Sequence, residues 1–212
     1  GPWERWINGV VFNLNGVCNV NAMRKSCFVG LSLGLTLLVS ACMPVFLYQK
    51  DYSFYDGDFV LSANSALRTD GFYVLEGMAD EQGNIADKPD VYEVYKFYKS
   101  GQVNFLLTDT LQENGVYLDA MKDQIEAGEA GRTLFQGYYK IQGDKIVIEQ
   151  ANTVTTNFIY SYALVNHDTL TVAKKTIEGG GAFRADYFSG KSTLVYRFTL
   201  DEKAESELSP NW

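Results

Sequence analysis

The stretch GYYKIQGDKIVIE, residues 137–149, decides the fold. Gly143 and Asp144 form the kind of two-residue turn that joins adjacent antiparallel strands. This turn pairs Ile141 with Ile146, and the large apolar side chains of the two strands then share one face. A shift of one residue would move them to the other face. The stretch therefore predicts a β-hairpin of defined register with one buried face.

Residues 157–173, NFIYSYALVNHDTLTVA, predict a second hairpin, since apolar and polar residues alternate on both sides of a turn. We expect a three-residue loop over residues 166–168. With this loop, one face of the hairpin points into the core with Tyr160, Tyr162, Leu164, Leu170 and Val172. We therefore expect Tyr162→Asp to be severe and Ser161→Asp to be mild.

Further strands extend this pattern along the chain. A hairpin over residues 92–108 turns at Ser100-Gly101, although its buried face stays open because Lys96 and Phe105 would pair. Opening and closing strands are expected from residue 71 and over residues 192–200. In residues 114–131 a short amphipathic helix is predicted by Leu118, Met121 and Ile125. We predict an antiparallel up-and-down barrel of roughly eight strands with one short helix, since closure removes exposed edges.

The segment MRKSCFVGLSLGLTLLVSAC, residues 23–42, resembles the signal peptide of bacterial lipoproteins. Two positive charges precede an apolar run of roughly a dozen residues, which is short for a membrane span. Small residues at 39–41 then lead to Cys42. The resemblance implies cleavage before Cys42 and a lipid on its thiol. An uncleaved membrane anchor is the alternative, because the uncharged stretch 26–49 is about 24 residues long.

These features divide the chain into five parts. They are translated upstream sequence foreign to the native protein (1–22), a signal peptide (23–41), a lipid anchor and tether (42–66), a lipocalin-like barrel (67–203) and a polar tail (204–212). Met43 rather than Asp follows Cys42. By the rule of the lipoprotein family, this implies an outer-membrane lipoprotein that faces the periplasm.

Charge and cysteine content narrow the partners. The net charge of −8 becomes about −10 once residues 1–41 are removed, and no basic cluster remains. This argues against nucleic acid as a partner and leaves the lipid on Cys42 as the contact with the membrane. Cys18 and Cys27 lie in the removed part, so no disulfide or zinc cluster forms within the chain. We expect a monomer without metal or cofactor.

Residues 67–200 resemble the lipocalin-like domain lipoproteins of Gram-negative bacteria. The resemblance is carried by LRTDGFY (67–73), YKFYKSGQV (95–103) and the hairpin at 137–149. It implies a calycin-like β-barrel. It also implies that Arg197 in the last strand covers the ring of Tyr73, as the closing arginine of the family does.

No enzyme signature is expected from the chain. His167 lies between Asn166 and Asp168 at a hairpin tip, which is turn chemistry. FSGKST at 188–193 lacks the first glycine and the helix of a phosphate loop. The acidic loop 76–90 matches no calcium-loop spacing. We therefore expect no catalytic residues and no metal ligands.

Two non-catalytic functions remain open. In the first, the barrel holds a small apolar or aromatic molecule, and its candidate wall residues are Tyr139, Tyr160, Tyr162 and Tyr196. In the second, the core is filled, and the domain is an envelope assembly or interaction module. We favour ligand binding by analogy with the fold type.

Overall fold

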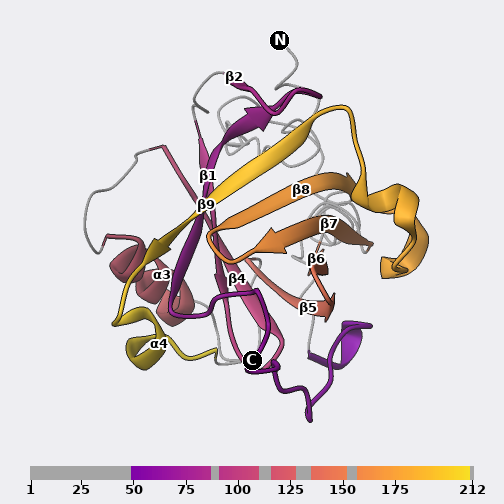
Figure 1. Ribbon diagram of the computed structural model, residues 1–212. Coiled ribbons are helices and arrows are strands. Elements are labelled where there is room, and N and C mark those ends of the chain that lie inside the picture. The colour runs from indigo at the N-terminus through magenta and orange to yellow at the C-terminus, as the bar shows by residue number, and fades with distance from the viewer. Residues whose placement is uncertain (1–48, 87–90, 110–115, 128–134, 152–156, 211–212) are drawn as a thin grey trace, which may run out of the picture. The chain divides into compact units, whose positions relative to one another are not determined.

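The computed structural model describes residues 49–86, 91–109, 116–127, 135–151 and 157–210 (Figure 1). The predicted signal peptide and its Cys42 lie outside the described residues. Within the described ranges, no helix has both the length and the apolar character that crossing a bilayer requires.

Eight antiparallel strands close into an up-and-down barrel (Figure 1). The barrel strands are β1 (Gly71–Ala79), β3 (Tyr92–Phe97), β4 (Gln102–Thr108), β5 (Gln136–Gln142), β6 (Lys145–Ala151), β7 (Phe158–Asn166), β8 (Thr169–Thr176) and β9 (Thr193–Leu200). The two-residue strand β2 (Ile85–Ala86) pairs with the end of β1. β9 pairs with β1 along its length and closes the sheet, which confirms the predicted fold class.

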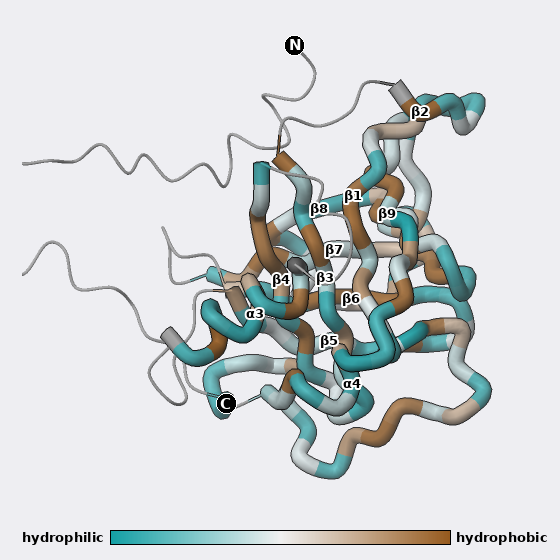
Figure 2. The backbone as a smooth tube through the Cα atoms, turned by 90° about the vertical axis from the view of Figure 1, so that its left-hand side faces the viewer, coloured by the Kyte–Doolittle hydropathy of each residue, from teal (hydrophilic) through white to brown (hydrophobic). Residues whose placement is uncertain are grey.

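The two ends of the barrel differ in how the strands are connected. At one end, which we call the hairpin end, short turns join β3 to β4, β5 to β6 and β7 to β8. At the other, which we call the loop end, the connections between strands are longer. Figure 2 shows brown, apolar stretches along the strands that alternate with pale or teal ones, while many of the turns are teal and polar.

Two helices cover the outer face of β1, β3 and β4. The predicted amphipathic helix is confirmed as α3 (Val116–Ala127), with Leu118, Met121 and Ile125 buried and Asp119 exposed. The chain after β9 forms α4 (Ala204–Glu207), which lies on the same side of the barrel as α3 (Figure 1). An ion pair between Lys122 and Glu207 joins the two helices.

The segment Gln49–Ala66, which we call the strap, covers the outer face of β5, β6 and β7. It begins with the 3-10 turn η2 (Gln49–Asp51). The ring of Tyr52 packs on Tyr138, and the ring of Phe54 packs on Tyr160. The buried carboxylate of Glu149 on β6 accepts hydrogen bonds from Ser53 Oγ at 2.5 Å and from Phe54 N at 2.9 Å.

The hairpin predicted over residues 137–149 is confirmed. Gly143 and Asp144 form the turn, Ile141 pairs with Ile146 and Tyr139 pairs with Ile148. Gly143 adopts a φ of 64°, which a glycine reaches without the strain that a Cβ would add. The register follows from the local sequence alone.

The predicted register of the β7–β8 hairpin is wrong by one residue. Asn166 pairs with Thr169 and Val165 pairs with Leu170, so the turn is His167-Asp168 and not a three-residue loop. Contacts from outside the hairpin hold this turn. The Tyr73 hydroxyl donates to the His167 carbonyl at 2.7 Å, and Arg68 pairs with Asp168 at 2.9 Å.

The shift exchanges the two faces of β7. Tyr160 and Tyr162 lie on the outer face, where Tyr162 packs on Tyr187 and Phe188 of η4 (Ala185–Phe188). Ser161 and Ala163 lie inside the barrel. The expectation that Ser161→Asp is mild is therefore contradicted, because Ser161 is fully buried.

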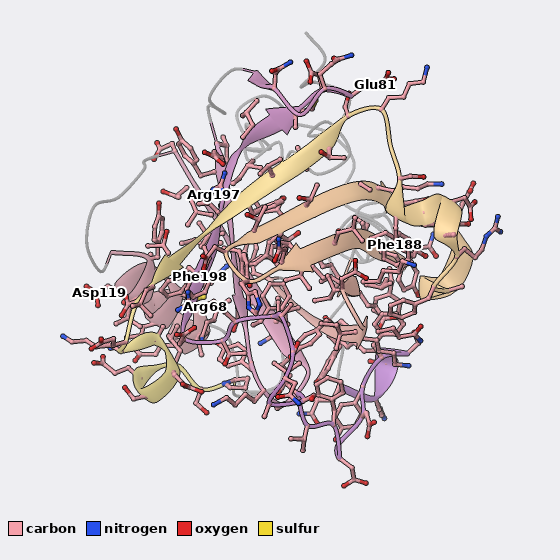
Figure 3. The ribbon with its side chains drawn as sticks, in the orientation of Figure 1. Arg68, Glu81, Asp119, Phe188, Arg197 and Phe198 are labelled. Atoms are coloured by element: carbon pink, nitrogen blue, oxygen red, sulfur yellow. The ribbon has the colours of Figure 1, made fainter. Side chains whose placement is uncertain are left out.

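The residue placed beside Tyr73 also differs from the prediction. Arg197 points outward and pairs with Glu76, while the guanidinium of Arg68 lies 3.9 Å from the centre of the Phe198 ring. Figure 3 shows Arg68 beside Phe198, with Arg197 farther along β9. The Phe198 ring in turn packs on the Tyr73 ring. The arginine at this end of the barrel therefore comes from the segment before β1 and covers Phe198, not Tyr73 as predicted.

Candidate functional site

Polar side chains gather inside the barrel toward its loop end. We call this group the inner polar cluster; its members are Glu93, Tyr95, Gln150, Ser161, Lys175 and Tyr196. The strand registers place all six on the inward face, since Tyr95 opposes Tyr73, and Ser161 opposes both Ile148 and Lys175. These residues come from five strands, so the cluster exists only in the closed barrel.

A β-bulge brings Lys175 into the cluster. Ala163 pairs with Val172, but the next pair is Tyr162 with Lys174, which leaves Ala173 as the extra residue. Strict alternation after Val172 would turn Lys174 inward. The bulge reverses the alternation, so Lys174 lies over the Tyr187 ring outside and Lys175 points inside. Bulges commonly re-aim side chains at barrel rims and beside functional sites.

An ion pair between Glu93 and Lys175 is the electrostatic centre of the cluster. Lys175 Nζ lies 2.6 Å from Glu93 Oε2, which also accepts a hydrogen bond from the Tyr196 hydroxyl at 3.2 Å. Burial raises the pKa of the Glu93 carboxyl, but the charge and hydrogen bond of Lys175 outweigh it and hold the pKa below its usual value. The side chains of Glu93 and Lys175 are 16% and 18% exposed, so the pair is largely but not fully buried.

Two buried hydrogen-bonding atoms of the cluster have no partner among the described residues. They are the hydroxyl oxygen of Tyr95 and the Nε2 atom of Gln150. Ser161 Oγ donates to the other amide atom, Gln150 Oε1, at 3.5 Å. Burial, together with the charge and hydrogen-bonding of Glu93, raises the pKa of Tyr95 well above its usual value, although Ser161 and Gln150 act in the opposite direction. The hydroxyl therefore stays protonated and lies near all three side chains. Neither it nor Gln150 Nε2 is held by a hydrogen bond of good geometry, so both can turn to an acceptor on an incoming group.

Apolar side chains surround the inner polar cluster. Ile148 opposes Ser161, and Leu75 opposes Tyr196 on the neighbouring strand. Both apolar side chains are buried. The cluster thus combines a small number of polar groups with apolar walls, which is the composition of a small-molecule binding site.

The structure separates the four tyrosines that the sequence predicted as ligand-binding. Tyr139 and Tyr196 lie inside the barrel: the Tyr139 ring packs on Phe97, and the Tyr196 ring packs on Tyr95. Tyr160 and Tyr162 lie outside, under the strap and η4. Only the inner two remain candidates, and Tyr139 lies toward the hairpin end with its hydroxyl bonded to the Tyr98 carbonyl.

Sequence reasoning missed Glu93 and Lys175. Glu93 and Lys96 lie on opposite faces of β3. Each face therefore carries one charged residue, and the sequence does not indicate which face is buried. The predicted pairing of Lys96 with Phe105 is wrong by one residue: Lys96 pairs with Asn104 on the outer face, and Glu93 turns inward. For Lys175 no sequence signal exists, because its inward direction depends on the bulge.

No group of three or more metal-ligating side chains occurs within the described ranges. The chain matches no protein-family model, no curated protein and no solved structure. The features that bear on function are therefore the barrel, which is consistent with a lipocalin-like fold, and the inner polar cluster.

Proposed function

We propose that this chain is an envelope lipoprotein whose barrel binds a small molecule at the inner polar cluster. The observation that carries the binding proposal is the pair of buried donors, Tyr95 and Gln150, beside the Glu93–Lys175 ion pair. A buried polar atom without a partner is costly in a finished core. A bound molecule that supplies the missing acceptors removes this cost.

The proposal also includes the cellular setting. Cleavage before Cys42 and acylation of its thiol would anchor the barrel to the outer membrane on the periplasmic side. The sequence of residues 23–42 supports this. Labelled palmitate should be incorporated in a Gram-negative host and lost in Cys42→Ser. A Cys42→Ser variant that still carries the label would contradict the anchor.

Native mass spectrometry of the full-length protein released from membranes tests the binding proposal. We expect a reproducible mass above that of the polypeptide and its lipid, lost in a Tyr95→Phe/Gln150→Leu variant. If wild-type protein from several preparations carries no such mass and binds none of the probes described below, binding at this cluster is excluded.

An alternative function is an assembly or interaction module with a filled barrel. Packing at the hairpin end favours this alternative. The rings of Tyr73, Phe97 and Tyr139 pack edge to face there and fill the interior. The two functions make different predictions for the cluster. A filled module keeps its function in cells when Tyr95 and Gln150 are replaced, whereas a binding protein loses it.

A further inference from the structure

We propose that the inner polar cluster accepts a neutral molecule that carries a hydrogen-bond acceptor, such as a carbonyl oxygen, on an apolar body. This inference rests on the proposed binding function and narrows the ligand class. It excludes carboxylates and amines as preferred ligands.

The charges inside the barrel balance each other. Among the described inward-facing residues of the strands, Glu93 and Lys175 carry the formal charges, and they neutralise each other at 2.6 Å. A carboxylate that entered would be attracted by Lys175 but repelled by Glu93, and an ammonium group would meet the reverse, so the neutral pair offers neither charge a net attraction. Either would add a net charge to a partly desolvated site, which is unfavourable. A neutral group avoids both penalties.

The unpartnered atoms of the cluster are hydrogen-bond donors. Gln150 Nε2 is a donor, and its sister atom Oε1 is already used by Ser161. The Tyr95 hydroxyl stays protonated and can also donate. The ligand must therefore supply acceptor lone pairs, and one carbonyl oxygen has two of them.

The side chains around the cluster indicate the chemistry of the rest of the ligand. Ile148 and Val172 face inward on strands that carry the cluster, Leu75 faces inward on the neighbouring strand β1, and all three are buried. The rings of Tyr95 and Tyr196 pack on each other, with their centres 5.1 Å apart, and add aromatic surface beside these side chains. An apolar or aromatic body matches these walls, since it loses little hydration when it is buried.

Three probes with the same apolar body test the charge preference: 4-butylbenzamide, 4-butylbenzoate and 4-butylbenzylamine. Isothermal titration calorimetry with the full-length protein at pH 7.5 measures each dissociation constant. Perturbation of the Gln150 and Ser161 backbone amide signals by NMR places the probe. We expect the amide to bind at least about 10-fold more tightly than the acid or the amine.

Matched variants test the two donors. Tyr95→Phe and Gln150→Leu should each weaken the amide about 3- to 10-fold, the loss that one hydrogen bond implies. The controls are Tyr162→Phe and Gln136→Leu, which remove the same kinds of unpartnered buried atom on the outer face of the barrel. Amide binding should be unchanged in both controls.

The outcomes separate the ligand class from the binding function. Equal or tighter binding of the benzoate or the benzylamine at the cluster overturns the neutral-acceptor class and keeps the binding function. Amide binding that the inner and outer variants weaken equally also overturns the class, because the donors then play no part. If none of the three probes perturbs Gln150 or Ser161, the proposed function fails together with the inference.

Discussion

The two ends of the barrel interior use tyrosine in opposite ways. At the hairpin end, the Tyr73 hydroxyl donates to the His167 carbonyl and accepts from the Arg68 backbone N–H at 3.1 Å. Tyr95 opposes Tyr73 and is equally buried, but its hydroxyl belongs to the inner polar cluster and has no partner among the described residues. The hairpin end is thus a completed core, while the loop end keeps hydrogen-bonding capacity unused. The completed core and the proposed binding cluster therefore use different hydrogen-bonding groups of the same interior.

Two lysines, one on each face of the barrel sheet, also differ in the group that balances their charge. Lys175 lies inside near the loop end and is neutralised by Glu93. Lys96 is fully buried on the outer face, and its ammonium group donates to the Thr69 carbonyl. Burial lowers the pKa of Lys96 to about 8, although Glu205 and Asp70 act in the opposite direction. The partner of the Lys96 ammonium group is a neutral carbonyl and not a carboxylate, so its charged form is stabilised less.

The largest effect is expected from breaking the inner ion pair. Lys175→Met leaves the Glu93 carboxylate without its cation and should lower the free energy of unfolding by about 3 kcal/mol, measured by urea unfolding at pH 7. The double variant Glu93→Leu/Lys175→Met should cost much less, since no uncompensated charge remains.

Arg197→Met is the matched control for Lys175→Met, because its exposed pair with Glu76 should contribute less than about 1 kcal/mol. The ionised Glu93 has a lowered pKa, so its stabilisation is present above pH 4.5 and is lost as the pH falls below that value. A Lys175→Met variant as stable as Arg197→Met would show that solvent screens the inner pair.

The next effect concerns Lys96 and pH. Since its pKa is about 8 when folded and 10.5 ordinarily, the unfolded chain binds more protons between these values. The cost of the buried charge is therefore present below pH 8 and is relieved as pH rises toward 10. We expect Lys96 to contribute a gain of about 2 kcal/mol over this range, measured as the difference in the free energy of unfolding between wild type and Lys96→Met.

Lys96→Met should remove this gain when urea unfolding is measured from pH 7 to 10. The buried tyrosines, whose pKa values are raised by burial, act in the opposite direction as the pH approaches 10, but they do so equally in both proteins and cancel in the difference. Parallel pH curves for wild type and Lys96→Met would refute the assignment.

A smaller effect is expected at the closed end of the barrel. Tyr73→Phe removes one donor and one acceptor and leaves the His167 carbonyl without this partner, which should cost about 1 kcal/mol in urea unfolding. Burial raises the pKa of Tyr73 to about 12, in keeping with a hydroxyl held in its protonated form. A loss below the error of measurement would mean that the hairpin end is not held by this hydroxyl.

The smallest effect, and the one that tests the comparison most directly, is expected for Tyr95→Phe. The hydroxyl removed has no partner among the described residues, so the free energy of unfolding should change by less than about 0.5 kcal/mol in the absence of ligand. With 4-butylbenzamide present, the wild type should gain more stability than the variant. If Tyr95→Phe and Tyr73→Phe cost the same without ligand, the two ends do not differ as proposed.

Much of the fold could be predicted from the sequence. The register of the Gly143-Asp144 hairpin follows from a turn and two alternating strands that are adjacent in the chain. The buried stripe of α3 follows from helical spacing, and the alternation of β9 places Leu194 and Tyr196 on one face. In each case the information lies within about a dozen consecutive residues, where local periodicity decides which side is apolar.

The candidate site could not be predicted, because only the tertiary structure decides which way its residues point. The β7–β8 turn sits one residue away from its expected position, where Tyr73 and Arg68 contact it from a distant part of the chain. The bulge at Ala173 then turns Lys175 inward to meet Glu93, which lies 82 residues earlier in the chain. Because a shift of one residue exchanges the faces of a strand, a small change made by distant contacts moves every side chain after it. The sequence by itself determined the strands and the barrel, and the closed barrel decided which polar residues lie within it.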